Sequence, residues 1–154
     1  MSNRDSSEAV PSSAGYAGDL DPKESWERLS RNTAAQLIDV RTIPEWNFVG
    51  VPDLGPLQRQ VLFCEWQHFP QGANDTFVRQ AAEALERTSY RPDVPLFFLC
   101  RSGARSRAAA IAMTAAGYGP CFNITDGFEG GLDTERHRGR SGGWKACGLP
   151  WIQT

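Results

Sequence analysis

The chain has 154 residues, enough for one domain with a hydrophobic core. Its formal net charge is −2, which gives no support for nucleic-acid binding. No segment approaches the roughly 20 apolar residues of a membrane span, and the first twenty residues lack the apolar stretch of a signal peptide. We therefore expect a soluble cytoplasmic protein with neither a nucleic-acid nor a membrane partner.

The cysteines and histidines do not form a metal-binding pattern. The four cysteines are widely spaced, include no Cys-x-x-Cys pair, and are Cys64, Cys100, Cys121 and Cys147. The two histidines lie far from one another and from any cysteine pair. We expect reduced thiols, no metal site and no cofactor. The sequence leaves open whether Cys147 is a redox partner of Cys100.

The N-terminal third begins with a polar stretch. Residues 1–20 are rich in Ser, Ala, Gly and Asp and are expected to be a flexible tail, with one domain over residues 21–154. Asp21-Pro22 starts a predicted helix that ends near Asn32. The apolar run from Ala35 to Arg41 predicts a buried strand.

The middle of the chain alternates loops with regular structure. Prolines and glycines between Pro44 and Gly55 predict a loop. Residues 61–66 predict a strand, and the apolar spacing over residues 75–88 predicts an amphipathic helix.

The last third holds the most apolar strand. Val94 to Leu99 predicts this strand, and the alanine-rich stretch from Ala104 to Ala116 predicts a helix that stops at Gly117. A final short strand is expected over 121–124, followed by a loop over 127–143 and a closing turn. Apolar strands that alternate with helices indicate an α/β domain with a mostly parallel sheet covered on both faces.

Ligands of such sheets bind beyond the carboxyl ends of the strands, where Cys100 lies. The loop from Arg101 to Arg105 leads directly into a predicted helix, whose free N–H groups and dipole favour an anion. The loop arginines add positive charge, so we expect a thiolate nucleophile. A lone cysteine at a strand end is otherwise most often an inert core residue. The arginines and glycine beside it favour the functional interpretation.

Four segments together resemble the single-domain rhodaneses, a family of sulfurtransferases. They are LIDVRTIPEW (37–46), FFLCRSGARS (97–106), NITDGFEGG (123–131) and GWKACGLPW (143–151). The resemblance implies a rhodanese-like three-layer domain, in which helices flank a mostly parallel central sheet. The sequence departs from the family in lacking the histidine of a His-Ile-Pro-Gly-Ala motif near Phe48. The stretches 53–77 and 132–142 are also unusual, and the latter is either a solvated loop or a basic rim.

The resemblance implies a thiosulfate sulfurtransferase that works without a cofactor. Cys100 would take sulfane sulfur from a small anionic donor as a persulfide and pass it to a thiophilic acceptor, such as cyanide, a thiol or a protein. The residues that would bind the donor are Arg101, Ser102, Gly103, Ala104, Arg105 and Ser106. Asp39, Arg41 and Glu45 would either orient this loop through ion pairs or cap the structure locally.

Loop length separates sulfur transfer from the nearest rival. The loop from Cys100 to Arg105 has the length of rhodanese loops. Tyrosine phosphatases place their arginine one residue later, where this chain has Ser106. The alternatives are a cysteine-based phosphatase or arsenate-type reductase, a non-enzymatic protein-binding module, and a persulfide carrier for one specific acceptor.

Overall fold

The computed structural model describes residues 15–153 of the chain. The part of the expected tail that covers residues 1–14 lies outside the described residues. The expected start of order at Asp21 is too late, because strand β2 (Gly18–Leu20) already pairs with β9 (Cys121–Ile124). The polar composition of this segment hid the strand, which adds an edge to a sheet formed by later residues.

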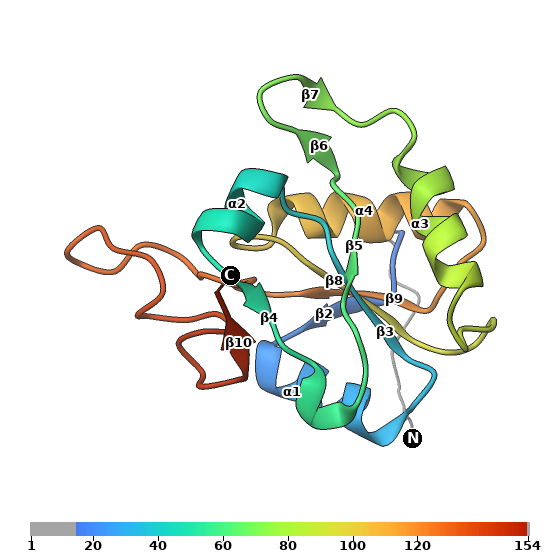
Figure 1. Cartoon of the computed structure of the whole chain (residues 1–154), viewed down its shortest axis with the longest axis horizontal. Helices are drawn as coiled ribbons and strands as arrows, with labels where there is room; N and C mark the ends of the chain where they lie inside the picture. Colours follow the sequence, from blue (N-terminus) through green and yellow to red (C-terminus); the bar gives the residue numbers. More distant parts are fainter. Residues whose placement is uncertain (1–14, 154) are drawn as a thin grey trace.

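A five-stranded parallel sheet lies at the centre of the molecule (Figure 1). Its strand order is β2 (Gly18–Leu20), β9 (Cys121–Ile124), β8 (Leu96–Leu99), β3 (Gln36–Asp39) and β5 (Leu62–Phe63). Every residue of the three inner strands β9, β8 and β3 is buried. Burial on both faces explains why these strands are mostly apolar rather than alternating, although they include the buried polar residues Gln36, Asp39 and Asn123. The expected α/β class with a parallel central sheet is confirmed.

Helices cover both faces of this sheet. The cluster on one face joins Phe98 of β8 to Ala81 of α3 (Phe77–Glu86) and Met113 of α4 (Ala104–Ala115). The other cluster joins Phe97 to Leu29 of α1 (Pro22–Arg31) and to the C-terminal segment. Helix α1 starts where the sequence predicts, because the Asp21 side chain accepts from the Glu24 N–H at 2.8 Å. Successive strand residues such as Phe97 and Phe98 thus point to opposite faces, and the sheet forms the middle of three layers.

The predicted loop after β3 contains a helix. Helix α2 (Ile43–Phe48) begins in a capping box: the Glu45 carboxylate accepts from the Thr42 N–H at 3.1 Å. Pro44 lies in its first turn, where a proline costs no hydrogen bond. The expectation of an irregular loop here is wrong, since the proline that suggested a break is compatible with a helix start.

Short elements complete the fold. A 3-10 turn, η1 (Gly55–Leu57), follows β4 (Val51–Pro52), which pairs antiparallel with β10 (Trp151–Ile152). A hairpin of β6 (Gln67–His68) and β7 (Gly72–Ala73) projects beyond the sheet near α2 and α4 (Figure 1). The strand predicted over residues 61–66 forms only over Leu62–Phe63. None of the described helices has the length and apolarity that crossing a membrane requires.

Candidate active site

Cys100 lies between the end of β8 and the start of α4. The backbone N–H of Gly103, the residue that caps α4, donates to the Cys100 sulfur at 3.2 Å. Gly103 has φ of 120°, a conformation that L side chains rarely adopt, so glycine suits this turn. The loop thereby folds back over its own cysteine, whose exposure is only 1%. The strand end and the helix N-terminus enclose the sulfur as the sequence predicts.

A glycine turn after β9 holds the start of this loop. The Phe128 N–H donates to the Cys100 carbonyl at 2.8 Å, and the Glu129 N–H donates to the Arg101 carbonyl at 3.0 Å. Gly127 has φ of 59°, and a Cβ there would collide with the Cys100 and Arg101 carbonyl oxygens. The NITDGFEGG segment therefore supports the backbone from which the loop departs.

Arg105 is paired with Glu45. Its two terminal nitrogens donate to the two Glu45 carboxylate oxygens at 2.7 and 2.9 Å. Burial disfavours the Glu45 carboxylate, but hydrogen bonds from Arg105 and Thr42 outweigh it and lower its pKa to about 2. The pKa of Arg105 is raised, first by its hydrogen bonds to Glu45 and further by negative charge at Cys100 and Asp39. The pair between Glu45 and a loop arginine is thus present, and it occupies the guanidinium fork.

A cavity of about 550 Å³ opens beside the loop. It is lined by Thr42, Pro44, Glu45, Val49, Gln67, Phe69, Arg101, Arg105, Glu129 and Arg138. Cys100 does not line it, although its neighbour Arg101 does. Arg138 comes from the glycine-rich segment after Gly130, whose carbonyl accepts from the Arg138 guanidinium at 2.8 Å. The exposed Arg101 of the loop and the half-buried Arg138 of this segment therefore place two cationic groups at one opening.

The six residues expected to bind a donor lie in different surroundings, and Arg105 is the one paired with Glu45. Arg101, Ser102 and Ala104 are exposed, and Gly103 contributes its N–H to the sulfur. Ser106 differs from the expectation because its side chain is fully buried and is absent from the cavity wall. Its hydroxyl instead lies 3.2 Å from the Cys100 sulfur. Ser106 faces the nucleophile from the protein interior, since it occupies the first turn of α4.

Asp39 and Arg41 pair with each other rather than with the loop. Both side chains are fully buried, and Arg41 donates to Asp39 at 2.7 Å and to the Gly50 carbonyl at 2.8 Å. The Arg41 guanidinium also lies over the Phe128 ring at 4.3 Å. Of the two roles that the sequence left open, this geometry matches local structural capping. Asp39 and Arg41 act on the loop through the contact of Arg41 with Phe128 and through the charge of Asp39 on Arg105.

The other three thiols lie in environments that oppose ionisation. Burial raises the pKa of Cys64 and of Cys121 to about 11 each. Burial also raises the pKa of Cys147, whose charged neighbours include Lys23 and Asp21. All four cysteines are free thiols. Among them, Cys100 is the one whose sulfur accepts from a backbone N–H at a helix N-terminus.

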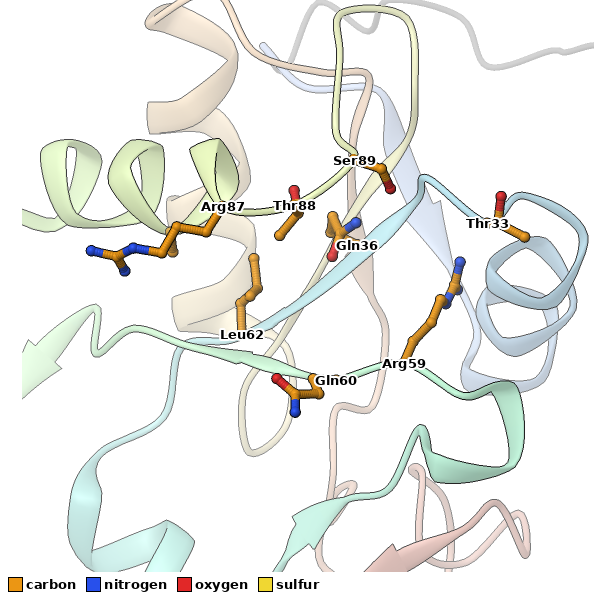
Figure 2. A pocket seen from close by; sticks show the side chains of 9 residues that line it. Thr33, Gln36, Arg59, Gln60, Leu62, Arg87, Thr88 and Ser89 are labelled. Atoms are coloured by element: carbon orange, nitrogen blue, oxygen red, sulfur yellow. The ribbon is translucent and has the colours of Figure 1, made fainter.

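Two further features near the surface carry no comparable chemistry. Asp133, Glu135 and His137 bring ligand atoms within 4.8 Å of one another, but an Asp133 oxygen already accepts from the His137 N–H at 2.8 Å in an exposed turn. A second cavity, of about 390 Å³, lies at the amino ends of β3 and β5 (Figure 2). Its Arg59 donates to the Asn32 and Leu29 carbonyls, and its Arg87 extends away from Gln36. This cavity lies at the amino ends of the strands, whereas Cys100 lies at the carboxyl end of β8.

Sequence reasoning missed three parts of the site. Asn123 accepts from the Ser106 hydroxyl at 2.6 Å, and a signal for it existed: one polar residue in the buried strand CFNI requires a partner. Arg138 lies in the segment considered as a basic rim, but nothing in the spacing placed it beside Arg101. The β6–β7 hairpin, which supplies Phe69 and Gln67 to the cavity wall, left no pattern that predicts its position.

The fold is that of a rhodanese-like three-layer domain, in agreement with its structural relatives. The family model described as the STR4 middle domain matches residues 18–154, and the chain belongs to that family. The crystal structure of Rv0390 from M. tuberculosis is 49% identical, has a TM-score of 0.81, and covers 90% of this chain and 99% of that one.

The chain is also similar to one further solved structure and to proteins known by sequence. The solution structure of a polysulfide-sulfur transferase homodimer from Wolinella succinogenes is 22% identical, with a TM-score of 0.54, covering 88% of this chain and 78% of that one. Uncharacterised proteins of Rickettsia conorii and Rickettsia prowazekii are each 38% identical over 128 residues, which is 83% of this chain and 91% of theirs. The fold is therefore shared, while the reaction has to be argued from the site.

Proposed function

We propose that this protein is a sulfurtransferase that carries sulfane sulfur as a persulfide on Cys100. The observation that carries the proposal is the Gly103 N–H, which donates to the Cys100 sulfur at the N-terminus of α4. Backbone donors and a helix dipole stabilise a thiolate, and they equally stabilise the terminal anion of a persulfide. The rhodanese-like fold, in which this loop occupies the strand ends, supports the same chemistry.

The first half-reaction loads the cysteine. The Cys100 thiolate attacks the outer sulfur of thiosulfate, a new S–S bond forms, and the donor's own S–S bond breaks with its electron pair leaving on sulfite. The enzyme is then a persulfide, Cys100–S–S⁻. Polysulfide, the donor that the Wolinella protein's name contains, reacts in the same way with a shorter polysulfide as the leaving group.

Guanidinium groups at the cavity are proposed to bind the donor's anionic end. Arg105 has its fork on Glu45, so we assign this role chiefly to Arg101 and Arg138. Arg105 then acts by fixing the loop and by its positive charge. This assignment modifies the expected role of Arg105 and adds a residue from the glycine-rich segment.

The second half-reaction unloads the sulfur onto a thiophilic acceptor. Cyanide or a thiolate attacks the outer sulfur, which leaves as thiocyanate or as a new persulfide, and the Cys100 thiolate returns. The cavity of about 550 Å³ exceeds the needs of thiosulfate, and the exposed Phe69 lies on its wall. We propose that the natural acceptor is a thiol larger than cyanide, either a small molecule or a cysteine of a protein.

The test is thiocyanate release from thiosulfate and cyanide, with turnover by the wild type and none by Cys100→Ser. Polysulfide replaces thiosulfate in a parallel assay, because the donor is part of the question. Hydrolysis of an aryl phosphate without sulfur transfer would support the phosphatase alternative instead. A protein without turnover in any of these assays, whose partner binding survives Cys100→Ser, would be a binding module.

A further inference from the structure

A chain of hydrogen bonds runs from the Cys100 sulfur to the surface. The Ser106 hydroxyl lies 3.2 Å from the sulfur and 2.6 Å from the Asn123 side-chain oxygen. The Asn123 amide nitrogen donates to the Asp19 carboxylate at 3.0 Å, and the same carboxylate oxygen accepts from the Tyr16 hydroxyl at 2.9 Å. Ser106 and Asn123 are buried, whereas Asp19 is exposed on β2. The nucleophile at the end of β8 is thus connected, through Asn123 of β9, to an exposed carboxylate on the edge strand β2.

The carboxylate at the end of this chain fixes the direction of every bond in it. An ionised carboxylate only accepts hydrogen bonds, so the Asn123 nitrogen faces Asp19 and the Asn123 oxygen faces Ser106. Two oxygens 2.6 Å apart require a hydrogen between them, and Ser106 is the one that carries it. The single hydroxyl hydrogen of Ser106 is therefore used on Asn123.

The orientation of Ser106 has a direct consequence for the sulfur. With its hydrogen on Asn123, the Ser106 oxygen presents a lone pair to Cys100 and can only accept from the thiol S–H. A thiolate in the same place would face that lone pair without a donor from Ser106. The arrangement in the structure therefore suits the protonated thiol, in opposition to the Gly103 N–H, which suits the anion.

We propose that Asp19 and Asn123 are positioning residues that hold Cys100 as a thiol by fixing the direction of the Ser106 hydroxyl. The thiol becomes a thiolate when this chain reverses. The sulfur's proton leaves to solvent, and the Ser106 hydrogen turns from Asn123 to the sulfur. The Asn123 amide rotates to donate to the Ser106 oxygen, and Asp19, being exposed, turns to water. The proposal rests on the proposed function only in taking Cys100 as the nucleophile.

Other charges act on the same groups without using this chain. Arg105 of α4 favours negative charge at Cys100, and Asp39 of β3 also acts on Arg105. Arg107 lies over the Tyr16 ring at 5.7 Å, near the outer end of the chain. A through-space effect of Asp19 on the sulfur has to be separated from its effect through Ser106, and a double-mutant cycle makes this separation.

The test measures the rate of Cys100 alkylation by iodoacetamide against pH, because only the thiolate reacts. Asp19→Leu frees the amide to rotate, and below the midpoint of the profile we expect the rate to rise roughly fivefold, the equivalent of one hydrogen bond. In a Ser106→Ala background the same Asp19→Leu change should have no effect. An equal rise in both backgrounds would mean a charge effect through space and would overturn the proposal, as would no rise at all.

Two further variants complete the test. Asn123→Leu removes the acceptor without changing charge, and it should accelerate alkylation like Asp19→Leu; an unchanged or slower rate in a folded protein contradicts the proposal. Tyr16→Phe removes the other hydrogen bond to Asp19 but leaves the carboxylate facing Asn123, so its profile should match the wild type. A rise equal to that of Asp19→Leu would indicate general loosening of β2 and overturn the proposal. Circular dichroism verifies the fold of each variant, and alkylation is independent of sulfur transfer.

Discussion

Glu45 and Arg105 lie sixty residues apart in the sequence and form a bidentate ion pair, with both contacts at 2.9 Å or less. The pair joins the first turn of α2 to the first turn of α4, and Glu45 also caps its own helix through Thr42. Each of the two side chains is 19% exposed, so water screens the interaction only partly. Glu45 of α2 thereby holds the active-site loop at Arg105, the residue at which the loop ends.

Replacement of Glu45 by Gln should destabilise the protein by about 1–3 kcal/mol at neutral pH, because a half-buried arginine loses its counter-charge. The folded pKa of Glu45 is about 2, against an ordinary value of 4.5. The contribution of ionised Glu45 to the free energy of unfolding is therefore present above about pH 4.5 and is lost as the pH falls toward 2. Urea unfolding across this range should show the wild type and Glu45→Gln converging at the acid end.

The matched control for that change is Glu24→Gln. Glu24 pairs with Arg28 on the outer face of α1, where the two side chains are 47% and 32% exposed, respectively. A pair of this kind contributes less than about 0.5 kcal/mol, so the variant should unfold like the wild type. Equal losses in the two variants would refute a special role of the Glu45–Arg105 pair.

Substitution of Gly127 by Ala should cost more than about 2 kcal/mol and most of the sulfur-transfer activity. Its φ of 59° disfavours a side chain, and a Cβ would press on the carbonyls of Cys100 and Arg101. Gly131→Ala is the control, since nothing lies within 4 Å of a Cβ there. Thermal unfolding and thiocyanate release measured on both variants check the prediction, and similar behaviour of the two would contradict the placement of the turn.

The inner part of the fold is predictable from sequence because burial on both faces leaves a simple pattern. Leu96–Leu99 is a short apolar run, Cys121–Ile124 is apolar except for Asn123, and the alanine-rich α4 follows the cysteine loop. The outer elements are not predictable in this way. Strand β2 is polar and depends on β9 for its hydrogen bonds, and α2 is hidden by a proline in its first turn.

The candidate site likewise has a part that is local in sequence and a part that depends on distant residues. Cys100 and its loop could be predicted because a strand end, a glycine and arginines are adjacent in the sequence. The partners of this loop come from elsewhere, and long-range pairing leaves no local signal: Asn123 lies 17 residues beyond Ser106, and Asp19 lies 104 residues before Asn123. Asp39 and Arg41 look like loop-orienting charges in sequence, but their side chains lie close enough to form an ion pair with each other.

Loss of Arg101 or Arg138 should raise the KM for thiosulfate about tenfold or more with a smaller effect on kcat, because a charge-assisted contact to the donor is removed. Arg140→Ala is the control, since Arg140 is 56% exposed and pairs with Glu135 away from the cavity. Steady-state kinetics with thiosulfate varied at fixed cyanide measure the effect. An unchanged KM in both Arg101→Ala and Arg138→Ala would remove these side chains from donor binding.

Cys100 should differ from the other cysteines in its reactivity and in the size of the thiol reagent that can reach it. Cys64 and Cys121 have pKa values of about 11 and stay protonated at neutral pH, so limited iodoacetamide should label Cys100 first. Because Cys100 is 1% exposed, a bulky maleimide should react with it far more slowly than iodoacetamide does. Peptide mapping by mass spectrometry locates the label. Preferential labelling of Cys64 or Cys121 would contradict the assignment of the nucleophile.

The most direct measurement is the intact mass of the reduced protein after incubation with thiosulfate. A persulfide on Cys100 predicts a gain of one sulfur atom that cyanide removes and that Cys100→Ser does not show. The same measurement with polysulfide covers a protein that prefers a different donor. A folded wild-type protein that gains no sulfur from either donor, or a Cys100→Ser protein that gains it equally, would contradict the account.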